Sequence, residues 1–166
     1  MIEVRVDDLA FYEGEAIVRP VNDLLQATTP VMRRLEIAAG PELPGILRLT
    51  QPLPVGAAVV TGAAALPVEL LVHGVVSSKE EPVSRDTVRL ALMSALQRAV
   101  AFEIKTVAMA PFGLGAGNLD IEDSADVMIP VLAEHLRRAP FPASVLIFAE
   151  NDLEEEALRS RIRGQA

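Results

Sequence analysis

Short apolar segments alternate with longer segments of helical periodicity, and this alternation restricts the fold more than any other feature of the chain. The segments with the composition of strands are 2–6, 16–18, 57–61, 69–76, 106–110 and 144–149. Helical periodicity is found at 30–39, 84–100, 121–139 and 152–163, and the proline-rich connection after the first of these allows at most one short helix, at 46–49. Strands and helices that alternate at these lengths predict a three-layer α/β/α sandwich with a mixed, mostly parallel central sheet of about six strands.

The length and composition predict one domain, residues 1–166, with an aliphatic core. A chain of 166 residues corresponds to about one domain, and 51% hydrophobic content is enough for a sizeable core although only 4% of the residues are aromatic. Acidic residues begin at Glu3, and no apolar stretch has the length of a signal peptide or a membrane span. We therefore expect a cytoplasmic protein that does not enter a membrane.

Several classes of function are disfavoured by composition alone. The chain has no cysteine, which removes disulfides, thiol nucleophiles and thiolate metal sites, and with His73 and His135 as its two histidines we expect no metal site and no cofactor. The net charge of −8 has the wrong sign for binding nucleic acid through its phosphates. Nucleic acid is therefore not an expected partner.

Two segments that follow strands are the candidates for chemistry, because ligands of open α/β sheets lie beyond the carboxyl ends of the strands. The first runs from Arg19 to Val31 and the second from Pro111 to Asp120, and each leads into a helix. The second contains three glycines at alternate positions, which lets backbone N–H groups approach an anion near the positive end of a helix dipole. This arrangement suits a diphosphate. The chain has neither a Rossmann fingerprint nor a P-loop.

Taken together, these segments resemble the macro domain, an α/β/α module that binds ADP-ribose and its derivatives. Asp8-Leu9 precedes the strand sequence AIVRPVN (16–22) as the family's "GDI" precedes "AIVNAAN", and PVMRRLEIAAG (30–40) is similar to its first helix. Residues 55–73 resemble the stretch that ends in a strand with His, and MAPFGLGAGNLD (109–120) stands in place of the family's phosphate loop. The resemblance covers nearly the whole chain.

The resemblance implies a set of ligand-binding residues. Asp8 would accept a hydrogen bond from the adenine amino group, Leu9 would lie beside the ring, and Asn22 would bind the distal ribose. The segments Thr28–Val31 and Gly113–Asn118 would surround the diphosphate. The implied ligand-binding residues are Asp8, Leu9, Arg19, Asn22, Thr28, Thr29, Val31, Gly113, Leu114, Gly115, Ala116, Gly117, Asn118 and Leu153.

The chain also departs from the family pattern. Arg19 stands where the family has Asn, and Thr28-Thr29-Pro30 replaces three glycines. Leu153 replaces the aromatic residue that stacks on adenine, so that only apolar contact would remain. A guanidinium at the mouth of the cleft would add bidentate recognition of phosphate. The alternative is that Arg19 pairs with a neighbouring acid, Glu15 or Asp23, at a solvated edge.

Three functions follow from these residues. The first is a module that binds ADP-ribose or a related phosphorylated nucleotide without turning it over. The second is a metal-independent hydrolase of ADP-ribosyl or O-acetyl-ADP-ribose esters, in which Asn22 and Asp120 would be the catalytic residues that orient a water. The third is a degenerate pocket on a protein that forms homo-oligomers. We expect His73 to be structural in all three.

Overall fold

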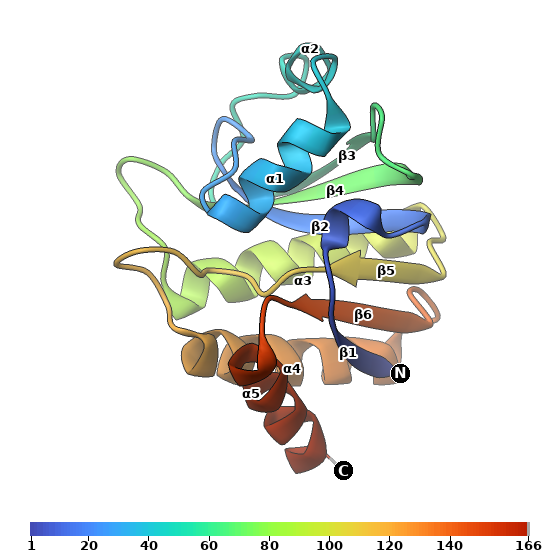
Figure 1. Cartoon of the computed structure of the whole chain (residues 1–166), viewed down its shortest axis with the longest axis vertical. Coiled ribbons are helices and arrows are strands. Elements are labelled where there is room, and N and C mark those ends of the chain that lie inside the picture. Colours follow the sequence, from blue (N-terminus) through green and yellow to red (C-terminus); the bar gives the residue numbers. More distant parts are fainter. Residues whose placement is uncertain (166) are drawn as a thin grey trace.

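Six strands form one mixed sheet in the order β1-β6-β5-β2-β4-β3. The computed structural model describes residues 1–165 (Figure 1). The strands are β1 (Ile2–Val6), β2 (Gly14–Asn22), β3 (Ala58–Gly62), β4 (Val68–Ser77), β5 (Thr106–Met109) and β6 (Ser144–Ala149). Every neighbouring pair is parallel except β3 and β4. The prediction of a mostly parallel six-stranded sheet between helical layers is confirmed.

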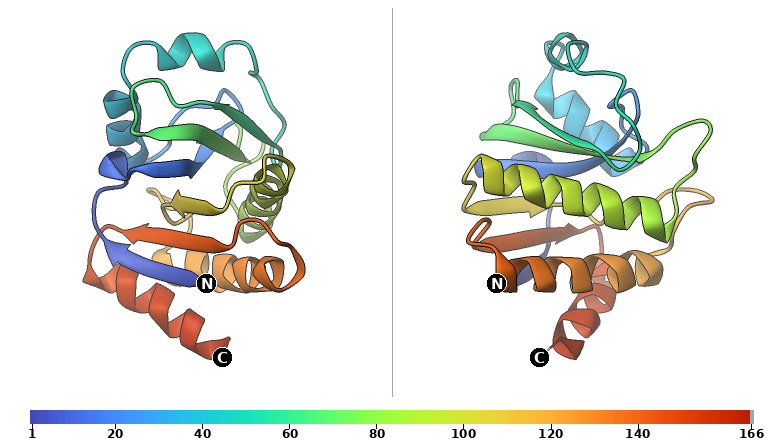
Figure 2. Two further views of the ribbon diagram at one scale, coloured as in Figure 1. Left: turned by 90° about the vertical axis from the view of Figure 1, so that its right-hand side faces the viewer. Right: turned by 180° about the vertical axis from the view of Figure 1, so that it is seen from behind.

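The helices lie on both faces of the sheet. One face carries the short 3-10 helix η1 (Leu9–Phe11) together with α1 (Pro30–Ala39) and α2 (Leu43–Leu47). The other carries α3 (Arg85–Ala101) and α4 (Ile121–Arg138), with α5 (Asp152–Gly164) at the side near β1 (Figure 2). No helix within residues 1–165 combines the length and the apolarity needed to cross a membrane.

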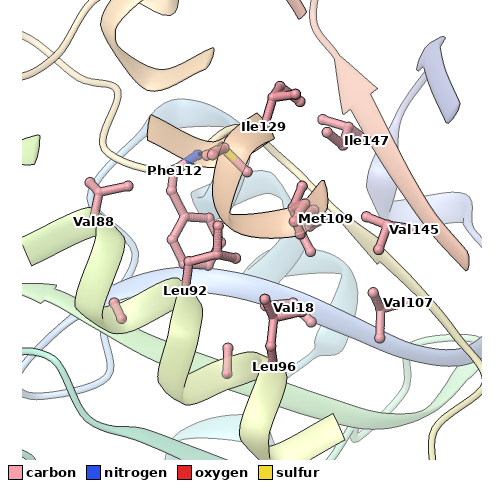
Figure 3. Close-up of a cluster of buried hydrophobic side chains, with 14 of the residues drawn as sticks. Val18, Val88, Leu92, Leu96, Val107, Met109, Phe112, Ile129, Val145 and Ile147 are labelled. Carbon is pink, nitrogen blue, oxygen red and sulfur yellow. Dashed lines mark hydrogen bonds between the residues drawn. The ribbon is translucent and has the colours of Figure 1, made fainter. Parts of the chain in front are cut away.

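Alternate residues of the central strands fill two separate cores. In β2, Ala16 and Val18 pack toward α3 and α4, whereas Ile17 and Val21 pack toward α1. Successive side chains of a strand point to opposite faces, so a strand covered on both sides is apolar at most of its positions. Figure 3 shows the first of these cores, where Val18 lies among aliphatic side chains of α3 and the neighbouring strands.

The helix starts agree with the capping residues in the sequence. Thr29 caps α1, its hydroxyl accepting from the Met32 amide, and Pro30 occupies the first helical position. The Ser84 side chain caps α3 through a capping box. Two details differ from expectation. The short helix after α1 begins at Leu43, earlier than the segment 46–49 suggested, and η1 was not predicted because a three-residue turn has no periodicity to detect.

The parallel arrangement brings three connections to one edge of the sheet. Strands β2, β5 and β6 run in the same direction, so the segments that follow them leave from the same edge. The β2–α1, β5–α4 and β6–α5 connections therefore lie close together, beside the η1 segment that follows β1.

Candidate functional site

A cleft opens at the carboxyl edge of the sheet, between η1, the start of α1 and the segments that follow β5 and β6. Its volume is about 190 Å³. The lining residues are Asp7, Asp8, Leu9, Thr29, Pro30, Val31, Met32, Arg34, Ala110, Pro111, Leu114, Gly115, Phe148, Glu150 and Glu154. Ligand pockets generally have volumes of about 300–1,000 Å³. A nucleotide would therefore fill this cavity and extend beyond it.

One part of the cleft combines a carboxylate with an apolar wall. The Asp8 side chain caps η1, where its Oδ1 accepts a hydrogen bond from the Ala10 amide at 2.9 Å. Its second oxygen, Oδ2, accepts no hydrogen bond from residues 1–165. Leu9 is buried next to it, and the Phe148 ring is held edge-on against Tyr12 with the ring centroids 5.7 Å apart. Asp8 can therefore accept a hydrogen bond from a ligand, while Leu9 and Phe148 can contact the face of a ligand ring.

Another part of the cleft presents backbone N–H groups without acceptors. The amides of residues 114–117 donate to no acceptor within residues 1–165, and two of these residues, Leu114 and Gly115, line the cleft. The Val31 amide belongs to the first turn of α1, where an N–H has no intrahelical acceptor. The two segments meet, since a Cβ on Gly115 would lie 3.6 Å from the Thr28 carbonyl oxygen. Such a concentration of free amides at a helix start favours an anion.

Charged side chains line the rim of the cleft. Arg34 is the single cation among the lining residues, and Nη2 of its guanidinium lies 3.0 Å from each carboxylate oxygen of Glu150. The Glu150 amide in turn donates to Oε1 of Glu154 at 2.9 Å. Asp7 and Asp8 add two further carboxylates. The lining is therefore acidic apart from Arg34 and the free amides.

The expectation that Arg19 lies at the mouth of the cleft is wrong. The residue is 0% exposed, and its guanidinium donates to Nδ1 of His73, Oε2 of Glu36 and the carbonyl of Leu25 at 2.8–2.9 Å. The partner acid is thus Glu36 of α1 rather than Glu15 or Asp23. All three guanidinium nitrogens are used in the interior, so none is available to a ligand.

His73 lies in the core, as expected of a structural histidine. Its Nε2 is 2.8 Å from the Thr61 hydroxyl, and its Nδ1 receives the hydrogen bond from Arg19. Burial and the neighbouring guanidinium hold the pKa of His73 well below its usual range. The imidazole is therefore neutral, and both of its nitrogens have partners within the protein.

Three more of the candidate residues do not line the cleft. Asn22 closes the turn after β2, where its Oδ1 accepts from the Leu24 and Gln26 amides at 3.0 Å. Asp120 caps α4 by accepting from the Asp123 amide at 2.8 Å. Leu153 is 70% exposed at the start of α5. The structure does not bring the two candidate catalytic residues, Asn22 and Asp120, together in this cleft.

The remaining candidates lie in or beside the cleft. Asp8, Leu9, Thr29, Val31, Leu114 and Gly115 line it. The candidates in the same two connections that do not line it are Thr28, Gly113, Ala116, Gly117 and Asn118. Within residues 1–165 there is no group of three or more metal-ligating side chains.

Sequence reasoning missed several lining residues. Phe148 had a detectable signal, because it lies near the end of a strand that leads to the same edge of the sheet. Arg34 lies one helical turn after Pro30 and so extends the same face of α1. Glu150 pairs with it from 116 residues away, and no local pattern could have indicated that contact.

Comparisons with known proteins agree with this architecture. A model of the macro domain family matches residues 18–128. An uncharacterised protein of Mycobacterium tuberculosis is 26% identical over 98% of this chain, which covers 45% of that protein. The chain thus spans a little under half the length of the first curated relatives it matches.

Solved structures share the fold. The Oceanobacillus iheyensis macrodomain with MES bound has a TM-score of 0.88 and 17% identity, over 99% of this chain and 91% of that one. The Trypanosoma brucei macrodomain in complex with ADP-ribose has a TM-score of 0.86 and 15% identity, over 97% of this chain and 68% of that one.

Proposed function

This chain belongs to the macro domain family, and from that premise we propose that its cleft binds ADP-ribose or a closely related phosphorylated nucleotide. The observation that carries the proposal is that one cleft holds both an Asp8 carboxylate oxygen and backbone amides that have no hydrogen-bond partner among residues 1–165. A nucleoside diphosphate needs both features, because its base carries donors and its phosphates carry negative charge. The Trypanosoma brucei macrodomain, which has the same fold, is described in complex with ADP-ribose.

We assign each part of the ligand to the group that complements it. The adenine amino group would donate to Oδ2 of Asp8, and the ring would contact Leu9 and Phe148. The diphosphate would accept from the amides of residues 114–117 and from Val31 at the start of α1. The substitution of Thr28-Thr29-Pro30 for three glycines removes one donor at Pro30 but leaves the cleft open.

We propose binding without turnover, by residues 1–166 acting as one module. The hydrolase hypothesis relied on Asn22 and Asp120 to orient a water, and the side chains of both residues are engaged in local turns and caps. The open cleft also favours a ligand-binding role over a degenerate pocket on an oligomer-forming surface.

Replacement of Asp8 by Asn tests the proposal with little change to the fold. Asn retains an oxygen for the Ala10 amide and is an equally good cap, but it replaces Oδ2 with an NH₂ donor. That donor would face the adenine amino group, so we expect ADP-ribose to bind about tenfold or more weakly, a difference of about 1.4 kcal/mol. Isothermal titration calorimetry measures the change.

A second ligand makes the test specific. Inosine diphosphate ribose carries an exocyclic carbonyl oxygen where adenine carries its amino group, so Asp8→Asn should bind it more tightly than the wild type does. Asp86→Asn removes the same charge from α3, away from the cleft, and should change neither affinity. Equal ADP-ribose affinities for wild type and Asp8→Asn, with similar melting curves, would contradict the assignment of Asp8. A wild type that binds neither ligand would overturn the proposed function.

A further inference from the structure

An ion pair crosses the cleft from one wall to the other. Arg34 projects from the second turn of α1, and Glu150 follows directly after β6. The guanidinium Nη2 contacts both carboxylate oxygens at 3.0 Å, and both residues line the cleft. The pair thus connects two segments between which a bound ligand would lie.

Of the two residues in this pair, only Glu150 has a further hydrogen bond within residues 1–165. The Glu150 backbone is fixed by the hydrogen bond from its amide to Glu154. Arg34 has no partner within residues 1–165 other than Glu150. The two side chains are 47% and 45% exposed, and an ion pair with this much access to water contributes little to stability. Arg34 can therefore exchange its partner at little cost to the fold.

A phosphate-bearing ligand offers Arg34 a stronger partner. Guanidinium groups bind phosphate with two parallel hydrogen bonds, and here a single nitrogen makes both contacts to Glu150. Among the lining residues, which all belong to the described part of the chain, Arg34 carries a positive charge and the other charged side chains are carboxylates. The ligand and Glu150 would compete for Arg34.

We infer that Glu150 is an intramolecular competitor that sets the affinity of the cleft for phosphate-bearing ligands by occupying Arg34. In the free protein Arg34 is paired with Glu150, and on binding Arg34 transfers to a ligand phosphate while Glu150 turns to solvent. The inference rests on the proposed function, because it assigns to the same cleft a specificity-determining pair. It makes Arg34 a ligand-binding residue and Glu150 a residue that weakens binding.

A double-mutant cycle with ADP-ribose tests the inference. Glu150→Gln should free Arg34 and tighten binding by about threefold or more, whereas Arg34→Met should weaken it. When Arg34 is already Met, Glu150→Gln should have less than half of its effect on log Kd in the wild type, because there is no cation left to release. Glu156→Gln removes the same charge from α5, outside the cleft, and should leave the affinity unchanged.

Each other outcome has a distinct meaning. Equal affinities for Glu150→Gln, Glu156→Gln and the wild type would overturn the competition while leaving ADP-ribose binding intact. The same tightening with and without Arg34 would attribute the effect to general repulsion and would also overturn it. Weaker binding by Glu150→Gln would make Glu150 a ligand contact and would overturn the competition as well. If no variant binds ADP-ribose while all melt like the wild type, both the proposed function and this inference fail.

Discussion

The buried Arg19 determines the protonation of its neighbour. An arginine always carries its Nε proton, so the 2.9 Å contact requires His73 to accept at Nδ1. The His73 proton therefore lies on Nε2 and is donated to the Thr61 hydroxyl, which itself donates to the Gly62 carbonyl at 2.9 Å. A proton added at Nδ1 would point at the guanidinium, so folding requires His73 to remain neutral.

This requirement predicts that the protein loses stability in mild acid. The pKa of His73 is depressed in the folded state, so below about pH 6.5 the unfolded chain binds a proton that the folded chain does not. The free energy of unfolding should fall as the pH decreases from about 6.5 toward the folded pKa, with a slope approaching 1.4 kcal/mol per pH unit at about 25 °C. Urea denaturation at several pH values measures this slope.

A glutamine provides the matched comparison. His73→Gln retains an oxygen that can accept from Arg19 and an NH₂ group that can donate to Thr61, but it has no titratable proton. We expect a shallower pH dependence for this variant than for the wild type. Identical slopes for His73→Gln and the wild type would show that another group titrates.

The position of Arg19 also marks a limit of local sequence reasoning. A charged residue near the end of a strand is ordinarily exposed, and the sequence around Arg19 suggests an acid such as Glu15 or Asp23 as its partner. The partners that bury it are 17 and 54 residues away, on α1 and β4. Only the assembled fold brings Glu36, His73 and Arg19 together.

At the scale of elements, the connection from β5 to α4 combines two different requirements for glycine. Gly113 and Gly117 both have positive φ angles, of +85° and +78°. A Cβ on Gly113 would lie 2.6 Å from Cγ2 of Val88, which belongs to α3, whereas a Cβ on Gly117 would meet nothing within 4 Å. The sequence predicted the glycine-rich loop but could not separate these roles, because the Val88 contact is made across the fold.

Alanine substitutions should separate the two roles. Gly117→Ala has only the backbone penalty and should cost about 1 kcal/mol of unfolding free energy. Gly113→Ala adds a clash with a packed helix and should cost about 3 kcal/mol. Urea unfolding with a common m value measures both. Equal losses for the two variants would mean that Val88 moves aside without cost.

The elements themselves differ in how readily they can be predicted. The start of α1 depends on Thr29 and Pro30, which act on the backbone within one turn. The first residue of this helix can therefore be predicted from a few adjacent residues of the sequence. The strand β2 is indicated by its run of mostly apolar residues, which pack on both faces of the sheet. The η1 turn depends instead on the hydrogen bond from the Ala10 amide to the Asp8 side chain, and a turn of three residues has no periodicity that would indicate it.

At the scale of the whole molecule, the cleft depends on the order of the strands rather than on any one segment. Strands β1 and β6 are at opposite ends of the sequence, yet they are paired in parallel from Ile2 with Val145 to Val6 with Ala149. This pairing places η1 beside the residues that follow β6 and so brings Asp8 near Glu150. The resemblance in the sequence predicted that Asp8 and the glycine-rich loop belong to the ligand site. That Glu150 and Glu154 line the same cleft could be seen only in the three-dimensional structure.

The separation of two hollows on the surface allows a test on the whole molecule. The cleft lies at the carboxyl edge of the sheet, whereas a second groove, between α3 and α4, is lined mainly by apolar residues such as Met93, Leu96 and Val131. If ADP-ribose binds in the cleft, the amides of residues 114–117, which have no acceptor within residues 1–165, gain phosphate acceptors. Amide hydrogen exchange should slow at 114–117 and near Asp8, and stay unchanged in α3 and α4. Slower exchange confined to α3 and α4 would place the ligand in the other groove. At an ADP-ribose concentration that half-saturates the wild type, a tenfold weaker Asp8→Asn variant is only about one tenth occupied, so most of the protection at 114–117 should be lost.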